Sequence, residues 1–418
     1  MMPHAPLLIT LASILGCLLV FSLGANEIAS IFSAALGANA MTVRYVILIA
    51  LGFECAGAIF GNGLVSSTMR YGIVDMNTVH AHAQLLTISL FAILLSGLTW
   101  MFITTFLGLP VSIMQTVISA IVGCSMLSFG TYAVHWGVVA KLAISWVVTP
   151  IMAGVIASLL VHGVLRTMLN IPHPFTLVKR NAPLLLFGFG FIFTFIAIIH
   201  GLNHWHYILT ARQQFMLSFS FGAVLLFFGK RLINRVAFDV QLGRQVEYQQ
   251  VEKIFSILVV FATSAMLFAH GANDLGDALG PYALLLDRFV KDGHVLATGV
   301  LPWWMISGAC IVMVLGLLMM GHRVIATVGQ QITLLTPSRA FIATFAAAIT
   351  SILAGSMGLE VSATQIFVGA ILGVGLSRGT AAVQFKTVRH IVLAWVLTFP
   401  LVATLAMFYF VCMQVVLT

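Results

Sequence analysis

Charged side chains are scarce in this sequence. Asp, Glu, Lys and Arg together make up 7% of the 418 residues, whereas 61% are hydrophobic. A chain of this length could not bury so much apolar surface inside a water-soluble particle, so lipid must be its solvent. The composition excludes a soluble globular protein and predicts an integral membrane protein.

Cysteines and early basic residues are also few. The five cysteines lie in apolar runs without C-x-x-C spacing, which argues against a zinc site or a disulfide framework. The first forty residues contain no Lys or Arg, and no small-residue cleavage pattern follows the first apolar run. A secretion signal carries both features, so we expect this run to be retained as a spanning helix.

Long apolar runs, by contrast, are abundant. A helix of about 20 residues crosses a hydrocarbon core, and runs near that length recur along the chain. The expected fold class is therefore an all-α integral membrane protein, a polytopic helical bundle. We expect spans at about residues 6–24, 43–63, 83–104, 136–163, 184–202, 211–229, 254–270, 296–320, 340–355 and 389–416. Hydropathy leaves open whether segment 110–130 is another crossing or a re-entrant hairpin.

The basic residues are distributed as in a membrane protein. The formal net charge is +8, but Lys and Arg are scattered through short polar breaks, so we expect no nucleic-acid partner. The longest polar segment, 230–253, is rich in Lys and Arg. By the positive-inside tendency, this segment is predicted to be cytoplasmic and the N-terminus to lie outside.

Two motifs occur twice with nearly the same offset. The tetrapeptide Gly24–Glu27 recurs as Gly271–Asp274, 247 residues later, and the segment Gly108–Gln115 recurs as Gly358–Gln365, 250 residues later. Internal repeats with Gly- and Pro-interrupted apolar segments are typical of secondary transporters, whose sites form between the repeats. We expect a first repeat over 1–166, intervening helices and a cytoplasmic linker over 167–253, and a second repeat over 254–418.

Several acidic residues fall within apolar runs or at their breaks. They are Glu27, Glu54, Asp274, Asp277 and Glu360. A carboxylate in lipid is costly, so such residues bind cations, carry protons or form buried structural pairs. The matched positions of Glu27 and Asp274 in the two motifs favour a functional role over a structural one. Glu54 has no matched partner, so a functional role and a buried structural pair both stay open for it.

The second repeated motif begins with Gly or Pro ahead of a short apolar segment. The first N–H groups of a helix, together with the hydroxyls of Ser112, Ser362 and Thr364, would make an anion site. An ordinary serine cap is the alternative. The matched pair of motifs favours ligand binding.

These motifs resemble those of the inorganic phosphate transporter (PiT) family, whose signature is a repeated Gly-Ala-Asn-Asp-x-Ala-Asn. The likeness extends to residues 68–73, 251–255, 321–325, 335–339 and 373–379. It implies inverted repeats, each with a re-entrant helical hairpin, and a homodimer in the membrane. It also implies phosphate symport with Na⁺ or H⁺, without enzymatic activity or a cofactor beyond the coupling ion. We expect a multi-pass protein of the plasma (inner) membrane.

The resemblance carries site residues onto this chain. Phosphate is expected to contact Asn26, Ser112, Asn273, Asp277, Ser362 and Thr364. The coupling cation is expected at Glu27, Asp274, Ser30, Gln115, Gln365 and Glu360. The family's hairpin usually reads Pro-Val-Ser-Thr-Thr-His, but here hydroxyls are lost and both histidines are replaced by glutamine.

These departures bear on the cation and the anion. Na⁺ prefers several neutral oxygen ligands, so their loss favours H⁺ coupling, with Glu27 or Asp277 as proton carrier. Phosphate near neutral pH can donate a hydrogen bond to a carboxylate, whereas sulfate only accepts, so direct contact with Glu27 or Asp277 would select phosphate.

A sulfate or other oxyanion permease and a transport-defective phosphate sensor both remain alternatives, and the spacing does not decide whether a metal–phosphate complex is carried. An intramembrane phosphatase lacks the expected nucleophile and acid set. The histidines His200, His204 and His206 lie beside Trp205, which favours an interfacial belt over a metal site.

Overall fold

The computed structural model describes residues 5–60, 72–74, 83–201, 209–237, 243–290, 299–357 and 359–417. The similar segment 68–71 and two of the grouped histidines, His204 and His206, lie outside these residues. Within them the elements are helices, with one isolated β-bridge between Val74 and Val134. In this described part of the chain, ten helical segments are long and apolar enough to cross a membrane. The all-helical, polytopic fold is thus confirmed.

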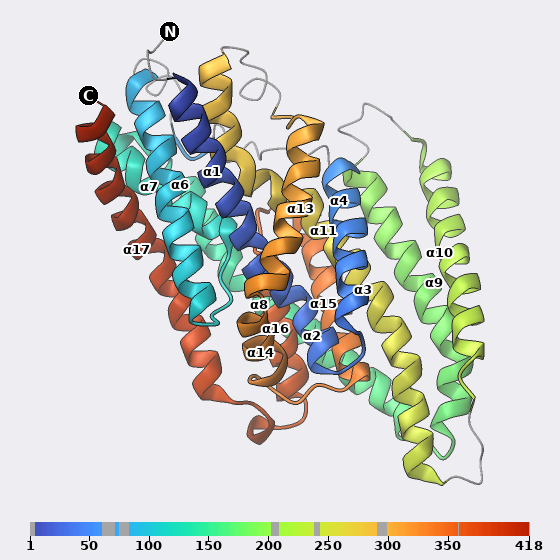
Figure 1. Ribbon diagram of the computed structural model, residues 1–418. Coiled ribbons are helices and arrows are strands. Elements are labelled where there is room, and N and C mark those ends of the chain that lie inside the picture. The colour runs from blue at the N-terminus through green and yellow to red at the C-terminus, as the bar shows by residue number, and fades with distance from the viewer. Residues whose placement is uncertain are drawn as a thin grey trace.

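The helices of the first part of the chain run alternately along the long axis of the molecule (Figure 1). Short π-helical or 3₁₀ turns join or extend several of them. The elements are α1 (Ala5–Leu23), η1 (Gly24–Ile28), α2 (Ala29–Gly37), α3 (Val43–Ile49), η2 (Ala50–Glu54), α4 (Cys55–Phe60), α6 (Ala83–Phe106), α7 (Ile113–Phe129), η4 (Thr131–Ala133), α8 (Trp136–Val164), η5 (Leu165–Leu169), α9 (Pro174–Gly201) and α10 (Ala211–Asn234).

The rest of the chain begins with the longest helix and ends beside the N-terminus. Both termini lie at one end of the bundle, and the last residues of α10 lie at the other (Figure 1). That arrangement agrees with the predicted opposition of the N-terminus and the polar segment. The elements are α11 (Arg244–Val290), α13 (Trp303–Met320), α14 (His322–Gln330), α15 (Pro337–Ser356), α16 (Ala363–Leu376), η8 (Thr380–Ala382) and α17 (Phe385–Leu417).

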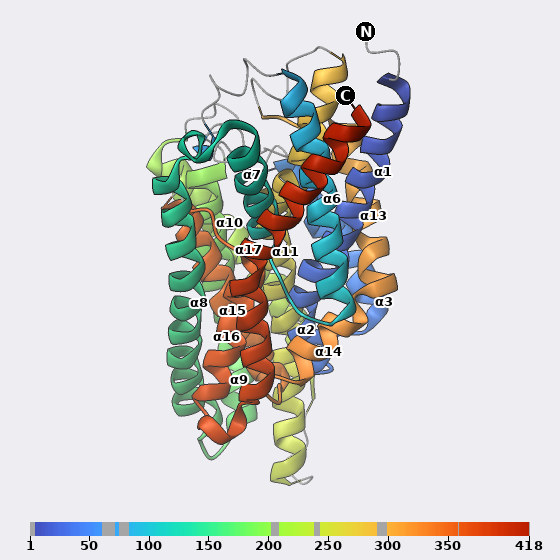
Figure 2. The ribbon, with the colours of Figure 1, turned by 90° about the vertical axis from the view of Figure 1, so that its left-hand side faces the viewer.

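Two helix pairs turn back before leaving the bundle. Helix α6 runs down from the end that holds the N-terminus, and α7 returns to that end (Figures 1 and 2). Helices α15 and α16 form the same shape from the opposite end. We name these the first hairpin (83–129) and the second hairpin (337–376). Each places the N-terminus of a short helix, α7 or α16, inside the protein.

Two predicted boundaries are wrong around the repeated tetrapeptide. The first span continues through Gly24 by a π-helical turn and extends to Gly37. No break occurs at Gly271, because α11 runs unbroken over 47 residues. A Cβ on Gly271 would collide with the backbone carbonyl of Glu54. This glycine therefore serves close helix packing and not helix termination.

Helix α13 meets the first span through glycines. A Cβ on Gly316 would collide with the carbonyl oxygen of Phe21, and one on Gly24 would collide with that of Met313. Small residues allow such backbone approach, which is a main source of helix association in lipid.

This contact gives a stability prediction with a control on the same helix. We expect Gly316→Ala to destabilise the fold by about 1–3 kcal/mol or more, because backbone must move to admit the methyl group. A Cβ on Gly308 meets nothing within 4 Å, so Gly308→Ala should not lower stability, since alanine favours a helix over glycine. Thermal unfolding of the purified protein in detergent measures both, and equal midpoints for the two variants would refute the close contact.

The apolar outer surface fits a lipid environment. Helix α8 exposes a stripe at helical spacing, formed by Ile144, Val147, Ile151, Val155 and Leu159. Its buried positions include the polar side chains of Ser145 and Thr149. A helix on the surface of a soluble protein exposes its polar side chains and buries its apolar ones, whereas α8 does the reverse. This pattern agrees with a multi-pass membrane protein.

Candidate substrate and coupling site

A buried histidine lies at the centre of three carboxylates. His270 Nδ1 is 2.5 Å from Glu54 Oε1, and its Nε2 is 3.0 Å from Glu27 Oε2 and 3.5 Å from Asp274 Oδ2. All four residues are at most 3% exposed. We call this set the carboxylate–histidine centre. It joins acidic residues of both predicted repeats at one imidazole.

Local helix geometry brings the two glutamates to this centre. Glu27 lies in the π-helical turn Gly24–Ile28, and Glu54 ends a second such turn, Ala50–Glu54. A π-turn inserts one residue and rotates the side chains that follow, and such turns are frequent at functional sites. His270 and Asp274 are one helical turn apart on α11, so their side chains share a face.

Glu27 links the centre to the first hairpin. Its Oε1 accepts a hydrogen bond from the Ile113 N–H at 2.5 Å, while its Oε2 contacts His270. Ile113 is the first residue of α7, so the carboxylate caps the positive end of that helix. Both carboxylate oxygens of Glu27 are thereby engaged by the protein.

Asn26 fastens the tip of the first hairpin. Its Nδ2 donates to Thr105 Oγ1 at 3.0 Å and to the Leu109 carbonyl at 3.1 Å, and its Oδ1 accepts from the Val111 N–H at 2.9 Å. The side chain is fully buried. Asn26 therefore holds the chain on both sides of Pro110.

Asn273, at the matched position, does not repeat this arrangement. It is exposed, and its Nδ2 donates to the Ala269 carbonyl of its own helix at 3.0 Å. The second hairpin's tip is also more open, since Leu359 is 37% exposed. One hairpin is thus docked on its asparagine and the other is not.

The two asparagines form a matched pair for mutation. We expect Asn26→Ala to lower the unfolding temperature clearly, because each buried hydrogen-bonding group left without a partner costs about 1–3 kcal/mol. Asn273→Ala should change it little. Thermal unfolding in detergent checks both, and an equal effect of the two variants would show that the first hairpin does not depend on Asn26.

The first turns of α7 and α16 meet each other. Ser112 and Ser362 cap these helices by accepting from the Gln115 and Gln365 N–H groups at 3.4 and 3.2 Å. Gln365 Nε2 donates to Gln115 Oε1 at 3.1 Å. The serines thus act as caps, which is one of the two readings of the motif, and the glutamine pair joins the first turns of the two helices.

The remaining predicted site residues lie at different depths. Ser30 is buried and donates to the Asn26 carbonyl at 2.8 Å. Asp277 and Thr364 are buried, at 1% and 0% exposure. Glu360 is half-buried, and its backbone carbonyl accepts from Ser145 Oγ at 2.9 Å. Their roles in binding stay predictions.

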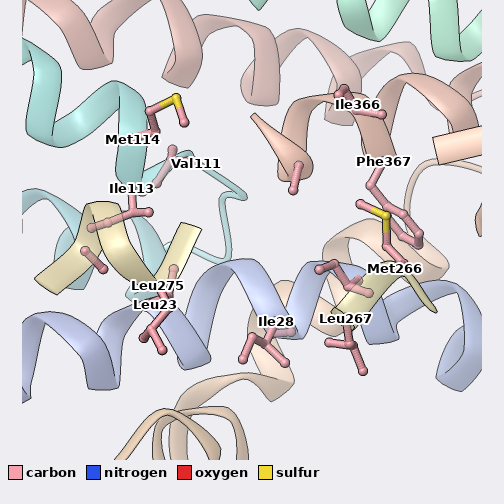
Figure 3. Close-up of a cluster of buried hydrophobic side chains, with 14 of the residues drawn as sticks. Leu23, Ile28, Val111, Ile113, Met114, Met266, Leu267, Leu275, Ile366 and Phe367 are labelled. Carbon is pink, nitrogen blue, oxygen red and sulfur yellow. The ribbon is translucent and has the colours of Figure 1, made fainter. Parts of the chain in front are cut away.

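Buried apolar side chains, here called the apolar shell, pack between the hairpin helices and the neighbouring spans (Figure 3). Ile113 and Met114 of α7 lie on one side, and Ile366 and Phe367 of α16 lie on the other (Figure 3). Residues of the first span and α11 close the space beneath them, including Leu23, Ile28, Met266, Leu267 and Leu275. Low polarity strengthens every charge interaction inside the shell.

The carboxylate–histidine centre has the chemistry to hold a cation. One ligand atom each from Glu27, His270 and Asp274 lies within 4.8 Å of the others. The same groups are also proton acceptors and donors. Glu54, at the far side of the imidazole, would orient the ring in either case.

The sequence did not clearly predict two members of the carboxylate–histidine centre, His270 and Glu54. His270 directly precedes the second Gly-Ala-Asn motif but was not among the predicted site residues, and Glu54 was left undecided. Their signal was a titratable side chain inside an apolar run, which is a functional pointer by itself.

Comparison with known proteins agrees with this geometry. Residues 23–406 match the model of the phosphate transporter family. A Haemophilus influenzae protein named among the phosphate permeases is 32% identical over 409 residues, covering 98% of this chain and 97% of that protein. The chloroplastic inorganic phosphate transporter 2-1 of Arabidopsis thaliana is 32% identical over 94% of this chain and 70% of its own length.

A solved structure extends the likeness to three dimensions. The structure of a sodium-dependent phosphate transporter superposes with a TM-score of 0.82 at 29% identity, covering 98% of this chain and 99% of that one. The chain therefore belongs to the phosphate transporter family, and it is a multi-pass membrane transporter and not an enzyme.

Proposed function

We propose that this transporter moves inorganic phosphate by proton symport. The observation that carries the proposal is the position of His270 between Glu27, Glu54 and Asp274. One imidazole supplies at most one positive charge to three carboxylates. Within this set, excess negative charge in an apolar surrounding is unfavourable unless protons or cations are taken up.

Charge balance then links the cation to the anion. An oxyanion that approaches the first turns of α7 and α16 adds further negative charge near the same centre. Prior uptake of a cation by the centre lowers the free energy of that approach. Release of either ion weakens the site for the other, which is the reciprocity that symport requires.

The residue types favour a proton as the coupling ion. Imidazole and carboxylate groups in hydrogen-bond contact share and exchange protons readily. Sodium is the second candidate, and the similarity to a sodium-dependent phosphate transporter supports it. Na⁺ is a hard cation that prefers oxygen ligands, so a centre built on an imidazole nitrogen suits it less well.

The asymmetric hairpins suggest how access alternates. Asn26 holds Leu109 and Val111 of the first hairpin. The corresponding positions of the second hairpin are Leu359 and Val361, 250 residues later. In the alternate state, Asn273 takes the role of Asn26 and closes the second hairpin while the first is released.

The chain's directions support an inverted repeat. Helix α1 runs away from the end that holds the N-terminus and α11 runs toward it, and the hairpins enter from opposite ends (Figures 1 and 2). We assign the repeats to 1–166 and 254–418, with 167–253 between them, and both hairpins as re-entrant. We further place the transporter in the plasma (inner) membrane as a homodimer, as the family resemblance implies.

Uptake into proteoliposomes tests the function. Purified protein is reconstituted, and entry of radiolabelled phosphate is followed under an inward proton gradient without sodium, and under a sodium gradient at equal pH. We expect accumulation in the first condition. Accumulation only in the second would assign sodium as the coupling ion, and none in either would indicate a sensor that has lost transport.

A further inference from the structure

The amide side chains of Gln115 and Gln365 form a directed chain between the two hairpins. Gln365 Nε2 donates to Gln115 Oε1 at 3.1 Å, and Gln115 Nε2 donates to the Trp395 carbonyl of α17 at 2.9 Å. Both glutamines are nearly buried, at 1% and 5% exposure. They occupy the same position in the two copies of the hairpin motif.

The direction of this chain is fixed by chemistry. A backbone carbonyl can only accept, so Gln115 must turn its NH₂ group toward Trp395 and its oxygen toward Gln365. Gln365 must then present its own NH₂ group to that oxygen. The amide oxygen of Gln365 is left at the end of the chain as an acceptor, so this assignment does not depend on which amide atom is called oxygen.

The residue before Gln365 carries a second buried polar atom that also lacks a partner in the described part of the chain. Gln365 Oε1 and Thr364 Oγ1 are both buried without a hydrogen bond among the described residues. They belong to the first turn of the 14-residue helix α16, whose first N–H groups have no partner within the helix. The first turn of α16 therefore carries backbone and hydroxyl donors as well as one obligatory acceptor.

We propose that the Gln115–Gln365 pair is the element that selects the oxyanion, with Gln365 Oε1 accepting a hydrogen bond from a protonated oxygen of the substrate. The helix N-terminus and Thr364 bind the unprotonated oxygens. Phosphate and arsenate carry a proton near neutral pH and satisfy this acceptor, whereas sulfate has none to donate. The inference rests on the proposed phosphate transport and adds the residue that discriminates.

The sequence led us to expect that Glu27 or Asp277 accepts the hydrogen bond from the protonated oxygen of phosphate, whereas the proposal gives this role to Gln365. Both oxygens of Glu27 already contact Ile113 and His270. Gln365 was expected to serve the cation. An acceptor in a site of this kind excludes the ligand that cannot donate, because the acceptor then stays buried without a partner.

Trp395 makes Gln115 a positioning residue. Without the Gln115 amide, Gln365 loses its orienting partner and can turn its NH₂ group toward the substrate. The NH₂ group can donate to sulfate as readily as to phosphate, so the site would no longer discriminate between them. Removing Gln115 should therefore relax selectivity although Gln365 itself is intact, an effect that a purely structural role would not produce.

The test compares phosphate and sulfate uptake by three proteins in proteoliposomes. They are the wild type, Gln365→Met, which removes the acceptor, and Gln115→Leu, which removes its orientation. We expect the ratio of phosphate to sulfate uptake to fall by about tenfold or more in Gln365→Met. A tenfold change in preference corresponds to about 1.4 kcal/mol. A fall in the same direction is expected for Gln115→Leu. Arsenate should follow phosphate throughout.

A variant can fold without transporting, so the unfolding temperature of each purified variant is also measured with phosphate and with sulfate. In both variants, phosphate should raise the unfolding temperature above that with sulfate by less than it does in the wild type. An unchanged preference in both variants would overturn the proposal. A changed dependence on the proton or sodium gradient at constant preference would also overturn it, because Gln365 would then hold the cation. Absence of phosphate uptake by the wild type would instead refute the proposed function.

Discussion

His270→Gln is expected to reduce phosphate uptake driven by a proton gradient by at least about 100-fold, the lower range for loss of a proton-transferring group. Glutamine can keep one of the hydrogen bonds of His270, but it cannot take up a proton between Glu27 and Glu54. The carboxylates then repel one another and the approaching anion. Initial rates of radiolabelled phosphate uptake into sodium-free proteoliposomes measure the effect.

His162→Gln is the matched control. His162 is exposed on α8, and its Nδ1 lies 2.7 Å from the Ser158 carbonyl of the same helix. This variant should transport like the wild type. Thermal unfolding of both variants separates loss of function from loss of fold. Normal proton-driven uptake by a folded His270→Gln variant would remove the imidazole from the coupling mechanism.

Glu27→Asp should lower proton-driven uptake by about 10- to 100-fold, the range seen when a partner that orients a metal-binding histidine is changed. The side chain loses one methylene, about 1.5 Å of reach. Its carboxylate can then no longer bridge the Ile113 N–H and the His270 imidazole, which Glu27 contacts at 2.5 and 3.0 Å. Glu27→Gln keeps the length but loses the charge, and its uptake should fall further. Initial uptake rates in sodium-free proteoliposomes rank the variants.

Glu247→Asp provides the control for helix capping alone. Glu247 is buried, and its Oε1 accepts from the Phe175 N–H at 3.1 Å near the start of α9. Shortening it should cost some stability without changing the proton dependence of uptake. If Glu27→Asp behaves in the same way as Glu247→Asp, the link from Glu27 to His270 has no part in coupling.

The sequence alone predicted the overall class of this protein well. Apolar runs long enough to span lipid predicted ten helical segments, and the resemblance of the repeated motifs predicted the family; both are confirmed. These features depend on composition and local pattern, which a single sequence displays directly. The matched tetrapeptides also predicted that acidic residues of both halves meet, and Glu27 and Asp274 do share His270.

The details of the site depend on helix geometry that hydropathy does not record. The π-helical turns at Gly24–Ile28 and Ala50–Glu54 rotate the two glutamates inward without changing the apolar pattern. Gly271 looked like a helix break, but it is a contact point for the Glu54 backbone. Asn26 binds the first hairpin whereas Asn273 binds its own helix, a difference that the similar motifs do not reveal. The roles of the predicted site residues stay predictions.

The central claim is that the carboxylate–histidine centre takes up a proton together with phosphate. Calorimetric titration of phosphate into the purified, sodium-free protein, repeated in buffers of different ionisation enthalpy, gives the number of protons bound with the anion. We predict uptake beyond that due to phosphate's own equilibrium, and loss of this excess in His270→Gln. A proton count explained by phosphate alone, or phosphate binding that begins only when sodium is added, would contradict the account.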